Sequence, residues 1–382
     1  MRDTTQLLQN FVSRLHGYIK DWPVDPDVLD GSTDWFNTMA LELFSIQFDR
    51  NRPYRKWCEK FDQTPEKTRM WHDIPAVPIR AFKEFRLTCL DESEVAHFFV
   101  SSGTTGKARS HHYHSNKSLA LYQSSLVSGF ENLFLHASLK NWNGIFVSMI
   151  PEASLAPNSS LAHMVQTLVG ATLSPHNEKI KYISDVSHEG YWRISEDKIN
   201  TLIESCAAIQ QPVIFMGTAF SYVHLTDYLH ERKTKINLPE GSLVMETGGY
   251  KGQSREVSRN ELHEMISDSL NVEGHQIITE YGMSELSSQA YRIPGSPPNP
   301  YVCPPWMRVR IINPESGKLS SLGEPGVIQV FDLANTWSVF AIETEDIGAQ
   351  WHGGFEVIGR SHLSEPKGCS LSETGLSFSK DP

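Results

Sequence analysis

The chain has 382 residues and a formal net charge of −11, and charged residues make up 21% of it. This length and composition are typical of a globular protein with a large core, and they argue against a disordered chain. The acidic balance argues against a general nucleic-acid binder, whose surface must offset phosphate charge.

The cysteines and the apolar runs exclude further classes of protein. The five cysteines are scattered without a Cys-x-x-Cys pair, which argues against a zinc cluster or a disulfide framework and fits a reducing compartment. No apolar run reaches the length of a membrane span, and the N-terminus lacks the apolar stretch of a signal peptide. We therefore expect a cytoplasmic protein that does not enter a membrane.

Residues 1–95 predict a mainly helical region packed on the core. One apolar stripe predicts a helix near residues 7–19, and a second helix is expected over 32–49. Pro75 and Pro78 forbid a regular helix in the next segment, so we expect residues 65–90 to form an extended arm against the core.

Predicted strands and helices alternate between residues 96 and 300. Strands are expected at 97–100, 145–150, 212–216, 243–246 and 275–280, and helices at 115–140, 161–168, 199–210, 220–229 and 258–270. This alternation predicts an α/β core with a mainly parallel sheet, helices on both faces and ligands at the carboxyl ends of the strands. Short strands and turns after residue 300 predict a small β subdomain and tail over 301–382.

A run of hydroxyl side chains and glycines follows the strand at 97–100 and ends in a cation. It consists of Ser101, Ser102, Gly103, Thr104, Thr105, Gly106 and Lys107. Such a run indicates a phosphate-binding loop, because glycines let the backbone approach the ligand while hydroxyls, N–H groups and a lysine bind its oxygens. The spacing is not that of a Walker A loop. The alternative is a flexible hydrophilic loop without a ligand.

The order Ser-Ser-Gly-Thr-Thr-Gly-Lys resembles the phosphate-binding loop of the adenylate-forming superfamily. Residues 278–285 resemble its Tyr-Gly-x-Thr-Glu motif. The resemblance implies that Tyr281 and Gly282 lie beside the adenine, that the Ser284 hydroxyl touches the α-phosphate, and that Glu285 helps to hold Mg²⁺. Taken alone, Glu285 also reads as a solvated carboxylate at a helix start.

Two further segments are similar to motifs of the same superfamily. Gly248 and Gly249 resemble its Gly-Gly turn beside the adenine, although such a pair marks any tight turn. By resemblance Asp346 accepts hydrogen bonds from the ribose hydroxyls, and Arg360 contacts ribose or phosphate. Glu345 stands where the superfamily usually has glycine.

The chain ends 22 residues after Arg360, so the resemblance implies an adenylate-forming large-domain fold without the full mobile C-terminal lid or its lysine. This short architecture and the helical N-terminal region resemble the acyl-protein synthetase family of bacterial bioluminescence. In that family a cysteine near the C-terminus receives the acyl group as a thioester, and Cys369 is the matching residue. The alternative is an incidental cysteine in the tail.

The resulting hypothesis is an enzyme that uses ATP and Mg²⁺ to convert a carboxylic acid, expected to be a fatty acid, into acyl-AMP. Lys107, Glu285 and Cys369 are the predicted catalytic residues, and an acyl reductase or another acyl-accepting protein is the expected partner. The sequence leaves open whether the protein forms a homo-oligomer. The alternatives are an aryl- or acyl-CoA ligase of the phenylacetate type and a degenerate nucleotide-binding scaffold.

Overall fold

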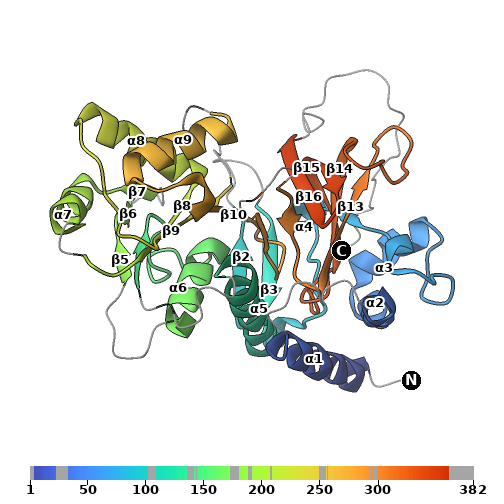
Figure 1. Cartoon of the computed structure of the whole chain (residues 1–382). Coiled ribbons are helices and arrows are strands. Elements are labelled where there is room, and N and C mark those ends of the chain that lie inside the picture. Colours follow the sequence, from blue (N-terminus) through green and yellow to red (C-terminus); the bar gives the residue numbers. More distant parts are fainter. Residues whose placement is uncertain are drawn as a thin grey trace.

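One large sheet runs through the molecule, and helices cover both of its faces (Figure 1). The computed structural model describes residues 4–22, 33–101, 109–135, 142, 144–172, 180–187, 192–206, 209–248, 255, 257–292, 295 and 299–360. The described part of the sheet has 12 strands, in a parallel half and an antiparallel half that meet at β10. The prediction of an α/β fold is therefore confirmed.

The parallel half holds the motifs that follow strand ends. Its strands are β5 (Ile180–Tyr182), β4 (Ile145–Ser148), β8 (Val213–Thr218), β9 (Leu243–Thr247) and β10 (Ile277–Tyr281), neighbours in that order. Neighbouring strands pair Phe146 with Ile214 and Val147 with Phe215, so alternate side chains enter opposite cores. These strands are apolar on both faces because helices cover both sides.

The helices that pack on these strands lie on both faces of the parallel half of the sheet. α7 (Glu196–Cys206), α8 (Ala219–Glu231) and α9 (Arg259–Leu270) pack on one face, and α5 (Asn116–Gly129) and α6 (Ser160–Thr172) on the other (Figure 1). The predicted helices at 161–168, 220–229 and 258–270 agree with these bounds to within a few residues. The helix predicted at 199–210 ends at Cys206, and the one at 115–140 ends as an α-helix at Gly129. A π-helical turn then covers Phe130–Phe134. Among the described residues, no helix is long and apolar enough to cross a bilayer.

The antiparallel half extends the same sheet beyond β10. Its strands are β11 (Ala290–Arg292), β12 (Tyr301–Val302), β16 (Gly354–Arg360), β15 (Ala341–Trp351), β14 (Pro325–Asp332) and β13 (Met307–Ile312), in that spatial order. β12 joins the C-terminal strands to β11 and hence to the parallel half. The division of the chain into 1–95, 96–300 and 301–382 stays a prediction.

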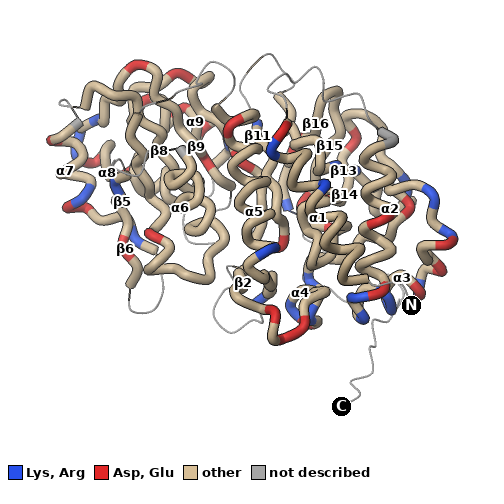
Figure 2. Tube along the Cα trace, turned by 90° about the horizontal axis from the view of Figure 1, so that it is seen from below, with Lys and Arg blue, Asp and Glu red and all other residues tan. Residues whose placement is uncertain are grey.

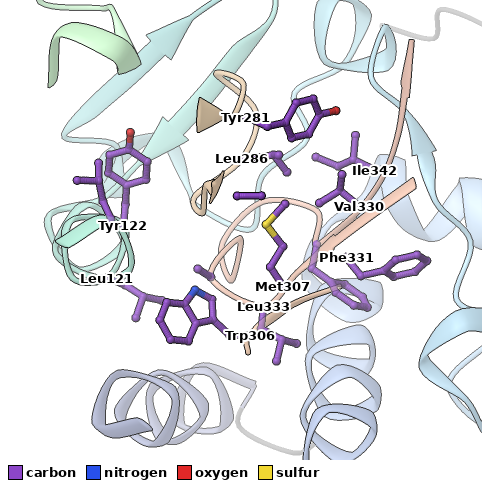
Figure 3. Packing of buried hydrophobic residues seen from close by; sticks show 14 of the residues in the cluster. Leu121, Tyr122, Tyr281, Leu286, Trp306, Met307, Val330, Phe331, Leu333 and Ile342 are labelled. Carbon is purple, nitrogen blue, oxygen red and sulfur yellow. The ribbon is translucent and has the colours of Figure 1, made fainter. Parts of the chain in front are cut away.

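The core between the two halves is filled mainly by large side chains. Figure 3 shows Tyr281, Leu286 and Trp306 packed between α5 and the strands that carry Val330 and Ile342. The Trp306 indole N–H, fully buried, lies within hydrogen-bond distance of the hydroxyls of Ser125 (2.8 Å) and Ser288 (3.0 Å). The core therefore reaches the segment just after β10.

The N-terminal helices pack on the core as predicted. α1 (Thr4–Lys20) lies beside α5, and α5 in turn lies between α1 and α6 (Figure 2). α2 (Thr33–Arg50) packs on α1, and α3 (Arg52–Lys60) follows it. The sequence prediction missed α3, whose start is capped by Asn51 accepting a hydrogen bond from the backbone N–H of Tyr54 at 3.2 Å.

The arm before the loop is partly extended, as expected. β1 (Val77–Pro78) pairs in parallel with β15, and the N–H of Ile79 donates to the Glu343 carbonyl at 2.8 Å. The expectation of extended chain throughout residues 65–90 is wrong at Trp71–Asp73, which form a 3-10 turn, and at α4 (Ala81–Glu84), which forms one helical turn. Once the prolines are passed, alanine, lysine and glutamate favour a turn that buries Phe82.

The sequence prediction also missed the hairpin whose two strands flank the predicted phosphate loop. β2 (His97–Val100) pairs antiparallel with β3 (His111–His114), so a strand separates the loop from α5. The expected strand–loop–helix order is therefore wrong at residues 111–114. Polar residues on the inward face concealed this strand from a reading based on apolar periodicity. A second small hairpin joins β6 (Ser184–Val186) and β7 (Trp192–Ile194).

Candidate active site

The two ends of the predicted phosphate loop are fastened to each other. The Ser101 N–H donates to the Ser110 carbonyl at 3.2 Å, and the Ser110 N–H donates to the Ser101 hydroxyl oxygen at 3.1 Å. The predicted loop residues Ser102, Gly103, Thr104, Thr105, Gly106 and Lys107 lie outside the described residues. Ser101 and Ser110, which lie on either side of these residues, therefore meet at one point.

That point touches Glu285. The Ser110 hydroxyl donates a hydrogen bond to the Glu285 carboxylate, and the Glu285 backbone carbonyl accepts one from the Asn335 amide at 2.8 Å. Burial raises the pKa of this carboxyl, while the Ser110 hydrogen bond and the positive charge of Lys83 act against the rise. The negative charge of Glu345 adds to the rise. A positive charge placed here would act against the rise and favour the ionised carboxylate.

Ser284 is held from two sides. His112 Nδ1 lies 2.9 Å from the Ser284 carbonyl oxygen, and the hydroxyls of Ser284 and Ser160 are 3.3 Å apart. The first contact comes from β3 and the second from the start of α6. The turn from residue 282 to 285 is thus fixed by elements on both sides of it.

Tyr281, Asp346 and Arg360 form a second group beside this turn. The Tyr281 hydroxyl donates to Asp346 Oδ2 at 3.0 Å, and Arg360 Nε lies 3.5 Å from Asp346 Oδ1. Asp346 and Arg360 are direct partners in the pairing of β15 with β16. The Arg360 side chain is 79% exposed, so its guanidinium is open to a ligand. The three side chains form one polar edge at the end of β10.

The glycines lie at the ends of adjacent parallel strands. Gly248 follows β9, and the register pairs Thr247 with Glu280 of β10. A Cβ on Gly282 would lie 2.4 Å from Glu280 Oε1, so a larger residue there would displace that carboxyl. Burial, with the nearby charge of Glu246, raises the pKa of Glu280 to about 8.

The predicted residues within the described part of the chain thus fall into one region. Ser101, Ser284 and Glu285 meet at the loop ends, Tyr281, Asp346 and Arg360 form the polar edge, and Gly248 and Gly282 lie at the strand ends. Gly249 and Cys369 lie outside the described residues, as Lys107 does. The roles of all these residues stay predictions.

Sequence reasoning missed the residues that support this region. Ser110, His112 and Asn335 each bind the 284–285 turn. No local signal marked the first two, because Ser-His-His-Tyr-His at 110–114 shows no alternation of polar and apolar residues. Asn335 lies 50 positions from Glu285 in a loop, and no local pattern connects the two.

Together these groups provide a carboxylate for a cation, hydroxyls for phosphate and a carboxylate for ribose hydroxyls. The described residues contain no group of three or more His, Cys, Asp or Glu side chains that could hold a metal ion by themselves.

Comparisons with known proteins agree with this chemistry. The model of the family described as "Acyl-protein synthetase, LuxE" matches residues 25–375. A long-chain-fatty-acid--luciferin-component ligase of Aliivibrio fischeri is 22% identical over 354 residues, covering 87% of this chain and 86% of the relative. The protein of the same name from Vibrio harveyi is 22% identical and covers 86% of this chain and 84% of the relative.

The fold also resembles that of a solved ligase. The structure of a 2-hydroxyisobutyryl-CoA ligase in an open conformation, with 2-HIB-AMP and CoA, superposes with a TM-score of 0.61 at 13% identity. It covers 85% of this chain and 74% of the ligase. At this identity the likeness establishes the fold alone.

Proposed function

Because the chain belongs to the acyl-protein synthetase (LuxE) family, an adenylate-forming ligase family, we propose that its acid substrate is a long-chain fatty acid. The acid is activated as acyl-AMP, and the acyl group then moves to a protein thiol. The names of the two relatives support the chain length of the acid. The contact between Ser110 and Glu285 carries the proposal for the site, since it joins the end of the loop to the predicted cation ligand.

In the first step a carboxylate oxygen of the acid attacks the α-phosphorus of ATP. The new oxygen–phosphorus bond forms as the bond to pyrophosphate breaks, and pyrophosphate leaves with the electron pair. Asp346, held by Tyr281 and Arg360, would accept hydrogen bonds from the ribose hydroxyls. This orients the nucleotide, and orientation of the reactants is a large part of such catalysis.

The residues around Glu285 fit a magnesium ion bound together with the phosphates. The oxygen ligand from the protein is the Glu285 carboxylate, which also accepts a hydrogen bond from the Ser110 hydroxyl. Mg²⁺ prefers such ligands and, when bound, neutralises charge on the phosphates. Glu285 would hold it from the buried side, while Lys107 would bind phosphate oxygens from the loop.

In the second step a thiolate attacks the acyl carbonyl carbon, and the bond to AMP breaks. We assign the thiol to Cys369. Burial raises the pKa of the Cys58 and Cys89 thiols to about 12, which makes these two cysteines poor nucleophiles. An acyl reductase as the next acceptor, a homo-oligomer and a cytoplasmic location stay predictions.

The first test is acid-dependent ATP–pyrophosphate exchange with Mg²⁺ and acids ranging from short aryl acids to long-chain fatty acids. We expect exchange that is fastest with a long chain. Lys107→Ala should lower the rate by the equivalent of about 2–4 kcal/mol. ATP binding without exchange for any acid would contradict the proposal and favour a nucleotide-binding scaffold.

The second test follows the acyl group with a radiolabelled fatty acid. Cys369→Ser should abolish labelling of the protein while leaving exchange in place, and Cys206→Ser is the matched control that should keep both. Release of product that strictly requires CoA, without acylated protein, would instead identify a CoA ligase.

A further inference from the structure

The inward face of β3 makes polar contacts at alternate residues. Ser110, just before the strand, binds the Glu285 carboxylate, and His112 contacts the Ser284 carbonyl. Two residues further, His114 Nδ1 lies 3.2 Å from the Ser118 hydroxyl at the start of α5. The same strand face therefore reaches the 284–285 turn through two side chains and the following helix through a third.

The contact from His112 has a defined donor. A carbonyl oxygen only accepts hydrogen bonds, so His112 Nδ1 carries the hydrogen and donates it to Ser284 at 2.9 Å. The His112 side chain is buried, with 3% of its surface exposed, and burial lowers its pKa to about 4. At neutral pH the ring is therefore neutral, in the tautomer that this hydrogen bond selects.

The peptide group between Ser284 and Glu285 depends on this donor. Its carbonyl oxygen faces His112, and the next carbonyl, that of Glu285, is held by Asn335. Without His112 the Ser284 carbonyl would lose this partner in a part-buried place, which costs part of the desolvation free energy of the group. The turn would then rotate toward another donor and move the carboxylate that follows it.

We propose that His112 is a positioning residue that, by donating to the Ser284 carbonyl, holds the Glu285 carboxylate at the end of the phosphate loop. The proposal rests on the proposed function for its catalytic consequence, since Glu285 matters there as the partner of the magnesium nucleotide. Its structural part concerns the turn alone and is measurable without any substrate.

The first experiment measures amide hydrogen exchange of the 281–288 segment in the ligand-free protein. His112→Leu removes the donor, and His112→Asn places an amide N–H close to the position of Nδ1. We expect exchange in this segment to become at least several-fold faster in the leucine variant and to return near the wild-type rate in the asparagine variant. His114→Leu, on the same strand face and packed against the His112 ring but without contact to Ser284, is the matched control and should change the segment much less than His112→Leu.

The second experiment measures MgATP binding by calorimetry and the acid-dependent pyrophosphate exchange. His112→Leu should weaken MgATP binding roughly tenfold and reduce kcat further, while His112→Asn restores most of both. If His112→Leu does not fold, His112→Asn and His112→Gln carry the test. The glutamine amide extends to the Nε2 position, so only asparagine should preserve binding.

The outcomes separate the two proposals. Unchanged hydrogen exchange and MgATP binding in His112→Leu would overturn the role of His112, as would equal effects of His114→Leu or equal behaviour of asparagine and glutamine. A wild-type protein that shows no adenylation, yet shows the expected pattern of hydrogen exchange, would overturn the proposed function and leave the role of His112 standing.

Discussion

Glu285 is buried, and within the described part of the chain its carboxylate accepts a hydrogen bond from the Ser110 hydroxyl. Burial raises the pKa of this carboxyl, and the charge of Lys83 lowers it again in part. Its environment is therefore incomplete without a further positive charge, which a bound cation would supply.

The corresponding prediction concerns Glu285→Gln, which keeps the shape and removes the charge. We expect the rate of acid-dependent pyrophosphate exchange to fall by about 10²–10³-fold, as for loss of one preorganised electrostatic group. Thermal unfolding should show a midpoint at or above that of the wild type, because a buried carboxyl is replaced by a neutral amide. Glu264→Gln, at an exposed position of α9, is the control and should change neither quantity.

The sequence predicts Tyr281, Ser284 and Glu285 because they lie within eight consecutive residues of a recognisable motif. It does not predict His112 or Asn335, whose contacts with the turn join segments distant in the chain. Such contacts depend on how the hairpin and the 335–340 loop pack, which local composition does not encode. The sites of chemistry are therefore more visible in the sequence than the residues that support them.

At the scale of elements, α2 supports the same region through Gln47. Its amide nitrogen donates to the carbonyls of Asn335 (2.8 Å) and Thr336 (3.2 Å), and its oxygen accepts from the Phe340 N–H at 3.1 Å. The side chain is fully buried. Since Asn335 in turn holds the Glu285 carbonyl, the N-terminal helices and the candidate site share one hydrogen-bonded loop.

We therefore expect Gln47→Leu to be strongly destabilising. Two backbone carbonyls and one N–H would lose a buried partner, so the free energy of unfolding should fall by about 2–4 kcal/mol in urea denaturation. Gln6→Leu, at an exposed position of α1, should change it by less than about 0.5 kcal/mol. Equal stability of Gln47→Leu and the wild type would show that the loop finds other partners.

Elements with strong periodicity were predictable, and short polar ones were not. α1 and α2 each bury an apolar stripe, and β8 and β9 are nearly continuous apolar runs. β3, in contrast, reads His-His-Tyr-His, and its strand conformation comes from pairing with β2 and from contacts of its polar side chains. Tertiary interactions decide its structure.

At the scale of the whole molecule, a buried histidine and a buried glutamate make the stability of the fold depend on pH. Their pKa values are shifted in opposite directions. Burial lowers the pKa of His112 to about 4, so its contribution to stability is lost as pH falls below about 6.5. Burial, together with Glu246, raises the pKa of Glu280 from 4.5 to about 8. The contribution of Glu280 is therefore fully present below pH 4.5 and is lost as pH rises through 8.

The variant Glu280→Gln tests how much stability the fold loses at alkaline pH through ionisation of Glu280. The amide does not ionise, so relative to pH 5 the variant should lose less stability at pH 9 than the wild type, by on the order of 2 kcal/mol. Urea denaturation at the two pH values measures the difference. Parallel profiles for wild type and variant would show that the Glu280 carboxyl titrates normally.

The pairing of β1 with β15 has a consequence for how the protein is made. Val77 lies next to Ile342, so the arm ahead of the phosphate loop finds its partner only after most of the chain has been synthesised. Arg360, on the last described strand, closes the polar edge around Asp346. A ribosome-bound chain that stops short of these strands should therefore remain unable to retain nucleotide, and it should keep the edge of β1 unpaired until the last strands are released.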